Sequence, residues 1–202
     1  MAAISDYADL LVAVSDYIGR DDFAGVFDRL VGLAEDKLNR RLRTSYQEET
    51  TTLTPDINGE ASLPADFVDV REAFLADQQY ARLQGMSPAA IRTYYGAIGG
   101  APRRYAVSGR TFIVRPIGQN AVTLNYYASI PPLASNPSNW LITEASDVYL
   151  WAVTLEAAIW AKNAEAIQAA KALADDAIAG LSNRDGRALW SNARVQVMGP
   201  TP

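Results

Sequence analysis

The chain has 202 residues, 49% of them hydrophobic, and a formal net charge of -5 at pH 7. A chain of this length buries roughly 70% of its unfolded surface, which is enough for one core and a small subdomain. It contains neither Cys nor His. This composition excludes disulfides, thiolate nucleophiles, Ser-His relays and the usual zinc ligand sets, so any catalysis would depend on carboxylates, Lys, Tyr or Ser.

The opening residues include Asp6, Asp9 and Asp16 and no basic region. That pattern argues against a signal peptide, and no apolar run approaches membrane-spanning length. We therefore expect a soluble, unexported protein with no membrane partner. A sequence pI near 4.8 disfavours tight wrapping of nucleic acid, since phosphate contacts need clustered Lys and Arg, but it leaves room for a local DNA-facing surface.

The first helical region consists of a short helix and a long one. The short helix is expected to follow Ser5 as its cap and to end at Gly19, which suits the left-handed conformation. The long helix is predicted from Asp21 to Thr44, with acidic residues at its start. Its apolar residues recur at three- and four-residue steps and predict one buried stripe: Phe23, Val26, Phe27, Leu30, Leu33, Ala34, Leu38 and Leu42.

From Gln47 the pattern changes to that of short strands. Two strands are expected around the turn Pro55–Gly59, followed by strands at Phe67–Leu75 and Tyr80–Leu83. Ser87 and Pro88 predict the start of a short helix that reaches Tyr95 and stops at Gly96. A hairpin turning at Ser108-Gly109 and a strand from Val122 to Tyr127 complete a mostly antiparallel sheet.

Helical periodicity returns at Thr143, breaks at Asn163 and stops after Leu181. The predicted fold class is therefore α+β, a helical bundle made of an N-terminal and a C-terminal helical hairpin, with an inserted, mostly antiparallel β subdomain. The predicted divisions are N-terminal helices at 1–46, a β-rich insertion with one short helix at 47–130, a C-terminal helical hairpin at 131–181 and an extended docking tail at 182–202. Gly186, Gly199, Pro200 and Pro202 are expected to prevent a continuing helix in that tail.

No catalytic, cofactor or metal site is predicted. The segment Gly96–Gly100 lacks the lysine and spacing of a phosphate loop, so a plain turn is the favoured interpretation. Acidic neighbours at Glu48-Glu49 and Asp175-Asp176 could serve as an acid and base pair only if they faced one cleft, and solvated faces are the simpler interpretation. Trp140, Trp151 and Trp160 are most simply core residues.

Two groups of residues are candidates for a partner interface. The first is the basic cluster at the end of the long helix, for which a phosphate contact, the helix dipole and an Asp36–Arg40 pair are alternative explanations: Arg40, Arg41 and Arg43. The second is a set of apolar residues in the tail, which strand addition on a partner would bury: Trp190, Val195, Val197 and Met198.

Four separated segments resemble the head-to-tail adaptor (connector or neck) proteins of tailed bacteriophages, especially those of short-tailed phages. They are AEDKLNRRLRT from Ala34, LPADF from Leu63, GAPRRYAVSGRTFIVRP from Gly100 and LNYYASIPPLASNPSNWLI from Leu124. Together they cover most of the span from about residue 20 to 160, in a consistent order. The resemblance rests on their order and spacing along the chain.

The resemblance implies a structural virion protein and no enzyme. It implies a helical bundle with a β insertion that assembles as a ring, usually of twelve copies, beneath the portal protein in the virion neck. Such a ring extends the DNA channel toward tail or nozzle proteins, and DNA passes through it without sequence-specific binding. An acidic chain suits a channel wall that must not hold DNA. Assembly is expected in the host cytoplasm.

Two other classes remain open. A terminase-like or regulatory DNA-binding protein would need a basic recognition helix, and the candidate helix is basic only over its last turn. A carboxylate-dependent hydrolase would need a cleft, and a concave pair of acids in the structure would favour it.

Overall fold

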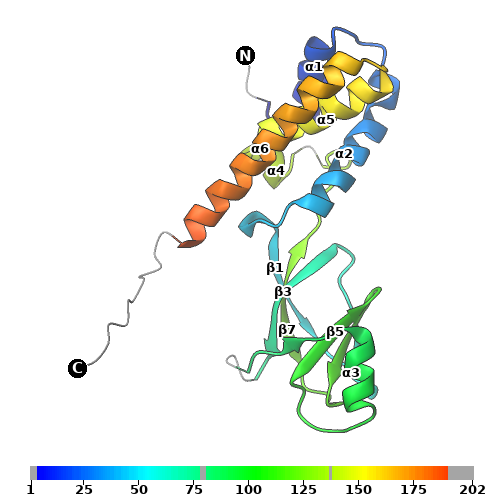
Figure 1. Cartoon of the computed structure of the whole chain (residues 1–202), viewed down its shortest axis with the longest axis vertical. Coiled ribbons are helices and arrows are strands. Elements are labelled where there is room, and N and C mark those ends of the chain that lie inside the picture. The colour runs from blue at the N-terminus through cyan, green and yellow to red at the C-terminus, as the bar shows by residue number, and fades with distance from the viewer. Residues whose placement is uncertain (1–3, 78–80, 137, 191–202) are drawn as a thin grey trace, which may run out of the picture. The chain divides into compact units, whose positions relative to one another are not determined.

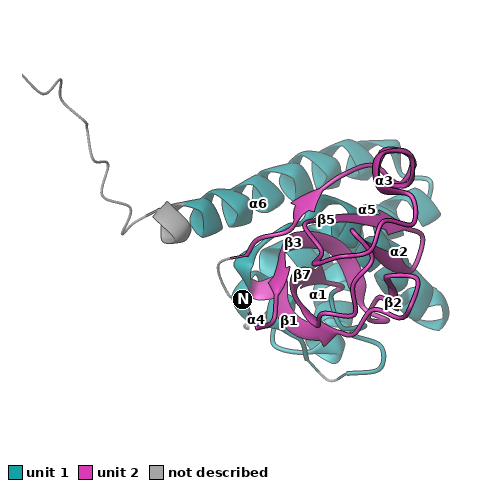
Figure 2. Ribbon diagram, turned by 90° about the horizontal axis from the view of Figure 1, so that it is seen from below, with its two compact units in different colours: residues 1–45, 130–202 teal, residues 46–129 magenta. Residues whose placement is uncertain are grey.

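The computed structural model describes residues 4–77, 81–136 and 138–190, with the backbone alone described from 187 to 190. Within these ranges the protein is a mixed α+β fold, as predicted from the sequence. It divides into two compact units, the first formed by residues 1–45 and 130–202 and the second by residues 46–129 (Figure 2). None of the described helices is both long and apolar enough to cross a bilayer.

Unit 1 consists of helices (Figure 1). Helix α5 is its centre, because α1 and α2 pack chiefly against α5 and α6 runs along it. The buried residues are mostly aliphatic, and the tryptophans expected in the core, Trp140, Trp151 and Trp160, are partly buried against them. The helices are α1 (Tyr7–Ile18), η1 (Ala24–Val26), α2 (Phe27–Arg41), α4 (Trp140–Glu144), α5 (Ser146–Trp160) and α6 (Ala164–Trp190).

The expected single helix from Asp21 to Thr44 is wrong at both ends. A 3-10 turn precedes α2, which begins at Phe27 without a side-chain cap, and Asp22 pairs with Arg20 instead of capping. Phe23 and Phe27 are both fully buried, and their burial fixes this entry. The helix ends because Leu42, also fully buried, has an extended backbone with φ -84 and ψ 135.

The first helix begins one residue later than expected. Its cap is Asp6, whose carboxylate accepts the backbone N–H of Asp9 at 2.9 Å, and Ser5 donates its own N–H and hydroxyl to Asp9. Gly19 ends the helix with φ 68, as predicted, because the left-handed conformation suits a residue without Cβ.

Helix α6 continues through the residues predicted to begin the extended tail, so the expected end at Leu181 is wrong. Gly186 lies inside this helix, where glycine costs only about 1 kcal/mol relative to alanine. Asp185, 7% exposed, hydrogen-bonds to Ser45 within unit 1 and holds this part of the helix. Tertiary contacts therefore outweigh the weak helix propensity of one glycine.

A buried carboxylate joins three segments of unit 1. Glu35 of α2, 6% exposed, accepts the backbone N–H of Leu133 at 2.8 Å and the hydroxyl of Tyr149 of α5 at 2.7 Å. Asn139 donates to the same hydroxyl at 2.8 Å and caps α4. One turn along α2, the side-chain oxygen of Asn39 accepts the N–H of Ile130 at 2.8 Å. These contacts fasten the chain that returns from unit 2 onto α2.

The described residues of unit 2 form two sheets and one α-helix, after the 3-10 helix η2 (Ser45–Gln47). The first sheet has the order β1-β7-β3 and the second β2-β6-β5-β4, with apolar side chains of both in one core. Helix α3 (Pro88–Tyr95) packs on β5 and β6. The strands are β1 (Glu48–Leu53), β2 (Glu60–Ser62), β3 (Phe67–Leu75), β4 (Gln84–Gly85), β5 (Arg104–Ser108), β6 (Thr111–Arg115) and β7 (Val122–Ala128).

Several local predictions in unit 2 are confirmed. Ser87 caps α3 by accepting the N–H of Ala90 at 3.2 Å, and Pro88 is its first residue. Strands β5 and β6 form the predicted hairpin, with Gly109 at φ 60 in the turn. Strand β7 has the predicted alternation of buried and half-buried residues and lies between two neighbours.

The pairing of the first two strands was predicted incorrectly. Strands β1 and β2 do not form a hairpin, because β1 pairs with β7 in one sheet and β2 with β6 in the other. The strand expected at Tyr80–Leu83 is shifted to β4, which pairs in parallel with β5. Tyr80 itself lies outside the described residues. All other strand pairs are antiparallel.

We predict that replacing Glu35 with Ala lowers the free energy of unfolding by about 2–4 kcal/mol, because it leaves two buried donors without an acceptor. Urea unfolding would measure this loss. Asp36→Ala, an exposed change at the next position, is the control and should cost far less. Equal losses in both variants would contradict the role given to Glu35.

The same residue predicts a pH dependence. Burial raises the pKa of Glu35 above its ordinary value of 4.5, so the folded state holds a proton that the unfolded state releases. The stability of the wild type relative to Glu35→Gln should therefore fall as pH rises through and above 4.5. Urea unfolding of both proteins across that range would test the sign, and a difference that grows with pH would contradict it.

Candidate interaction sites

The three basic residues at the end of α2 have different surroundings. Arg41 pairs with Asp175 of α6 at 2.7 Å, and its hydrogen bond, followed by that of Lys171, holds the pKa of Asp175 below its usual value. Arg43 follows the helix and donates to the carbonyl of Asn39 at 2.8 Å. Arg40 is exposed and pairs with no carboxylate among the described residues, so the expected Asp36–Arg40 pair is not formed. Among the described residues Arg40 is therefore the one of the three that forms no ion pair or hydrogen bond, although the Arg41 side chain is also 50% exposed.

The outward face of α2 displays an apolar side chain beside Arg40. Leu33, predicted to be in the buried stripe, is 43% exposed. It lies seven residues before Arg40 and so falls on the same side of the helix, together with Arg29 and Asp36, which are also exposed. We call these four residues the α2 outer face. A single exposed leucine is common on protein surfaces, so this face is a candidate contact because of its position beside Arg40.

The candidates from the tail lie mostly beyond the described residues. Trp190 is the last residue of α6, and its side chain is not described. Val195, Val197 and Met198 lie outside the described residues, so their role as a docking strand stays a prediction.

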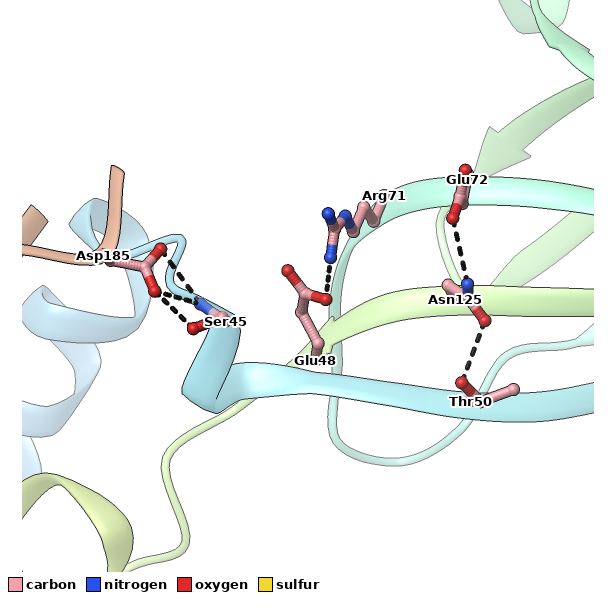
Figure 3. Close-up of polar contacts among 7 residues, drawn as sticks. All are labelled: Ser45, Glu48, Thr50, Arg71, Glu72, Asn125 and Asp185. Carbon is pink, nitrogen blue, oxygen red and sulfur yellow. Dashed lines mark hydrogen bonds and ion pairs between the residues drawn. The ribbon is translucent and has the colours of Figure 1, made fainter. Parts of the chain in front are cut away.

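A buried carboxylate near the C-terminal end of α6 binds the segment that follows α2 (Figure 3). Asp185 accepts the backbone N–H of Ser45 at 3.1 and 3.2 Å through its two oxygens, and the Ser45 hydroxyl also donates to it. Ser45 directly follows the segment that ends α2. No local pattern in the sequence predicts this contact, because the two residues are far apart in the chain.

The adjacent carboxylates considered as catalytic pairs do not converge. Glu48 forms an ion pair with Arg71 on the first sheet of unit 2 (Figure 3). Beside it, Asn125 of β7 accepts from Thr50 at 2.9 Å and donates to Glu72 at 3.1 Å, so a row of hydrogen bonds crosses the three strands. These charged groups stabilise the sheet surface.

An open groove in unit 1 contains three carboxylates. We therefore compare it with the cleft that a carboxylate-dependent hydrolase would need. It has a volume of about 210 Å³ and is lined by Glu144, Asp147, Asp176 and Arg184. Glu144 pairs with Arg184 at 3.3 Å, and Asp147 and Asp176 are exposed. Carboxylate catalysis needs one acid whose pKa is raised by burial, and this groove buries none of its acids. Within the described residues no cluster of metal-binding side chains occurs.

The segment Gly96–Gly100 forms a turn held by a buried arginine. Arg115, 8% exposed, donates to the carbonyl of Gly96 at 3.0 Å and to that of Asn58 at 2.9 Å. Gly59, at φ 68, packs so closely that a Cβ there would lie 2.8 Å from the carbonyl oxygen of Val114. Arg115 thus ties the turn after β1 to the turn after α3, at one end of unit 2.

Three large apolar side chains are exposed on these two turns and on the helix before them. Ile57 is 76% exposed, Tyr94 is 72% exposed and Ile98 is 57% exposed. Each lies within two residues of a carbonyl that Arg115 binds. Sequence reasoning missed this group, because only the folded position of Arg115 brings residues from both turns together.

We predict that Asp185→Ala loosens the end of α6, because the hydrogen bonds to Ser45 are lost, and lowers the free energy of unfolding by about 2 kcal/mol. Hydrogen exchange at residues 180–186 should become faster. Asp176→Ala, an exposed change on the same helix, should leave exchange unchanged. Unaltered exchange in Asp185→Ala would show that other contacts hold this part of the helix.

Comparison with known proteins gives one family. A model of the SU10 adaptor protein family matches residues 5–197. A search of curated proteins gives no match. The matched range includes both units and the four segments that resemble phage adaptors. The chain belongs to the SU10 adaptor protein family, a family of phage structural adaptors.

Proposed function

We propose that this protein is a structural virion protein that forms a ring beneath the portal in the phage neck. The ring, of twelve copies, extends the DNA channel and provides the attachment site for tail or nozzle components. It assembles in the host cytoplasm and lets DNA pass without binding a specific sequence. The observation that supports this proposal most is the family match over residues 5–197.

The side chains of the structure are consistent with a protein that binds proteins. The one groove considered for carboxylate chemistry buries none of its acids. The α2 outer face offers an apolar and charged surface, as subunit contacts need. A net charge of -5 reduces attraction between a channel wall and DNA.

A DNA-binding role for the end of α2 is less favoured. Arg41 and Arg43 are engaged by Asp175 and by backbone carbonyls, so of these three arginines only Arg40 has no such partner among the described residues. Phosphate-dependent binding requires several cations together. We therefore assign this end of the helix to a protein contact.

We predict that co-expression with the portal protein of the same phage yields a closed ring attached to the portal. Mass measurement of the purified assembly and electron microscopy of its end views would detect it and give the number of copies. Two proteins that stay separate at micromolar concentration and low salt would contradict the proposal.

The α2 outer face provides a second prediction. The double variant Leu33→Asp, Arg40→Glu should reduce ring or portal assembly about tenfold or more, because it removes apolar area and reverses a charge. Its melting temperature should be nearly unchanged, because both side chains are exposed. Arg110→Glu, an exposed arginine of unit 2, is the control. Normal assembly of the double variant would exclude the α2 outer face, and loss of duplex binding alone would assign it to DNA.

A further inference from the structure

Charge is distributed unevenly along unit 2. Its eight carboxylates all lie between Glu48 and Asp77, where there is one arginine, Arg71. From Gln78 to Thr143 the sequence has no Asp, Glu or Lys. It has six arginines: Arg82, Arg92, Arg103, Arg104, Arg110 and Arg115. A long stretch of one sign is unusual in an acidic chain, since surfaces normally mix both signs.

Four of these arginines lie at the end of unit 2 where Arg115 joins the two turns. Arg104 of β5 is directly opposite Arg115 of β6, and the N–H of Arg103 donates to the carbonyl of Arg115 at 2.9 Å. Arg92 lies in the last turn of α3, and its carbonyl accepts the N–H of Gly96 at 2.9 Å. Arg110 is at the opposite end of the β5–β6 hairpin.

We define the unit 2 tip as the three arginines whose backbone lies at this end, together with the exposed apolar residues of the two turns and of α3: Ile57, Arg92, Tyr94, Ile98, Arg103 and Arg104. Arg92 and Arg103 are exposed, and none of the three arginines pairs with a carboxylate among the described residues. Asp56, in the same turn as Ile57, is occupied by that turn, because it accepts the N–H groups of Asn58 and Glu60 at 2.8 and 2.9 Å. The charge of the tip is left for a partner to neutralise.

We propose that the unit 2 tip binds a protein surface with carboxylates around an apolar centre. This inference rests on the proposed function, since it assigns the tip to a different protein of the neck or tail. The tip combines the residues that contribute most to protein interfaces, Arg and Tyr with an aliphatic centre, and lacks Lys, which such interfaces disfavour. Guanidinium groups also suit paired carboxylates, which they bind through two parallel hydrogen bonds.

A second copy of the chain and DNA are outcomes that the test separates from the proposal. Contacts in a closed ring are heterologous, so a neighbouring copy would have to bring its acidic residues between Glu48 and Asp77 to the tip, and failure of the double variant to form rings would assign the tip to that contact. DNA phosphates would accept hydrogen bonds from the arginines, but they would not bury the side chains of Ile57 and Ile98, which are 76% and 57% exposed.

The test compares the double variant Arg92→Glu, Arg103→Glu with Arg110→Glu, which changes an exposed arginine of the same stretch at the other end of the hairpin. Each full-length protein is titrated at low and high salt against purified portal protein, the purified tail protein that attaches to the head, and a short DNA duplex. The double variant should bind one of the two proteins about tenfold more weakly or worse, with reduced salt dependence, and should form rings normally. Arg110→Glu should bind as the wild type does.

Three other results would contradict the proposal for the unit 2 tip. Rings that form and bind both proteins equally well with wild-type and double-variant tips would overturn the tip proposal and leave the proposed function standing. Loss of binding to the duplex alone would assign the tip to DNA. A wild-type protein that forms no ring and binds neither protein would overturn both proposals.

Discussion

The buried carboxylate of Glu35 is the interaction on which unit 1 depends most. Apolar contacts alone are non-directional, so they would not fix where the segment that returns from unit 2 packs along helix α2. Here the carboxylate accepts from Leu133 and Tyr149, and Asn39 fixes Ile130 one turn along the same helix. The chain therefore leaves the helices for unit 2 and returns to a defined position. Burying a carboxylate is costly, and it is tolerated because hydrogen bonds satisfy it.

This network explains the structural role of polar residues in two of the four segments that resemble phage adaptors. The first contributes Glu35 and Asn39, and the fourth contributes the backbone N–H groups of Leu133 and Ile130 that they bind. The fourth segment also contributes Asn139, which donates to the Tyr149 hydroxyl that Glu35 accepts. Polar residues that appear unremarkable in a helix and in a proline-containing loop are thus two halves of one network. Their function is to position the helices, and the surfaces open to partners lie elsewhere, on the α2 outer face and at the unit 2 tip.

Charged residues that are paired within their own unit support the fold, and charged residues without such a partner are the candidates for binding other proteins. Arg41, Glu48 and Asp185 face partners within their own unit, so they support the fold. Arg40 and the tip arginines face no carboxylate among the described residues, although each is as basic as its neighbours in the sequence. The sequence predicted Arg40, Arg41 and Arg43 as one group, because the three arginines are equivalent in sequence. Only the fold distinguishes them, because it places an acid beside one of the three.

The sequence by itself determined the features that depend on neighbouring residues. The α+β class, the cap of α3 at Ser87, the β5–β6 hairpin and the end of α1 at Gly19 all follow from local backbone preference and periodicity, which a short window contains. Only the tertiary structure decided that β1 and β2 belong to different sheets and that α6 passes through Gly186. Strand pairing and helix length are set by contacts between distant segments, whose free energy exceeds the local preferences that the sequence displays.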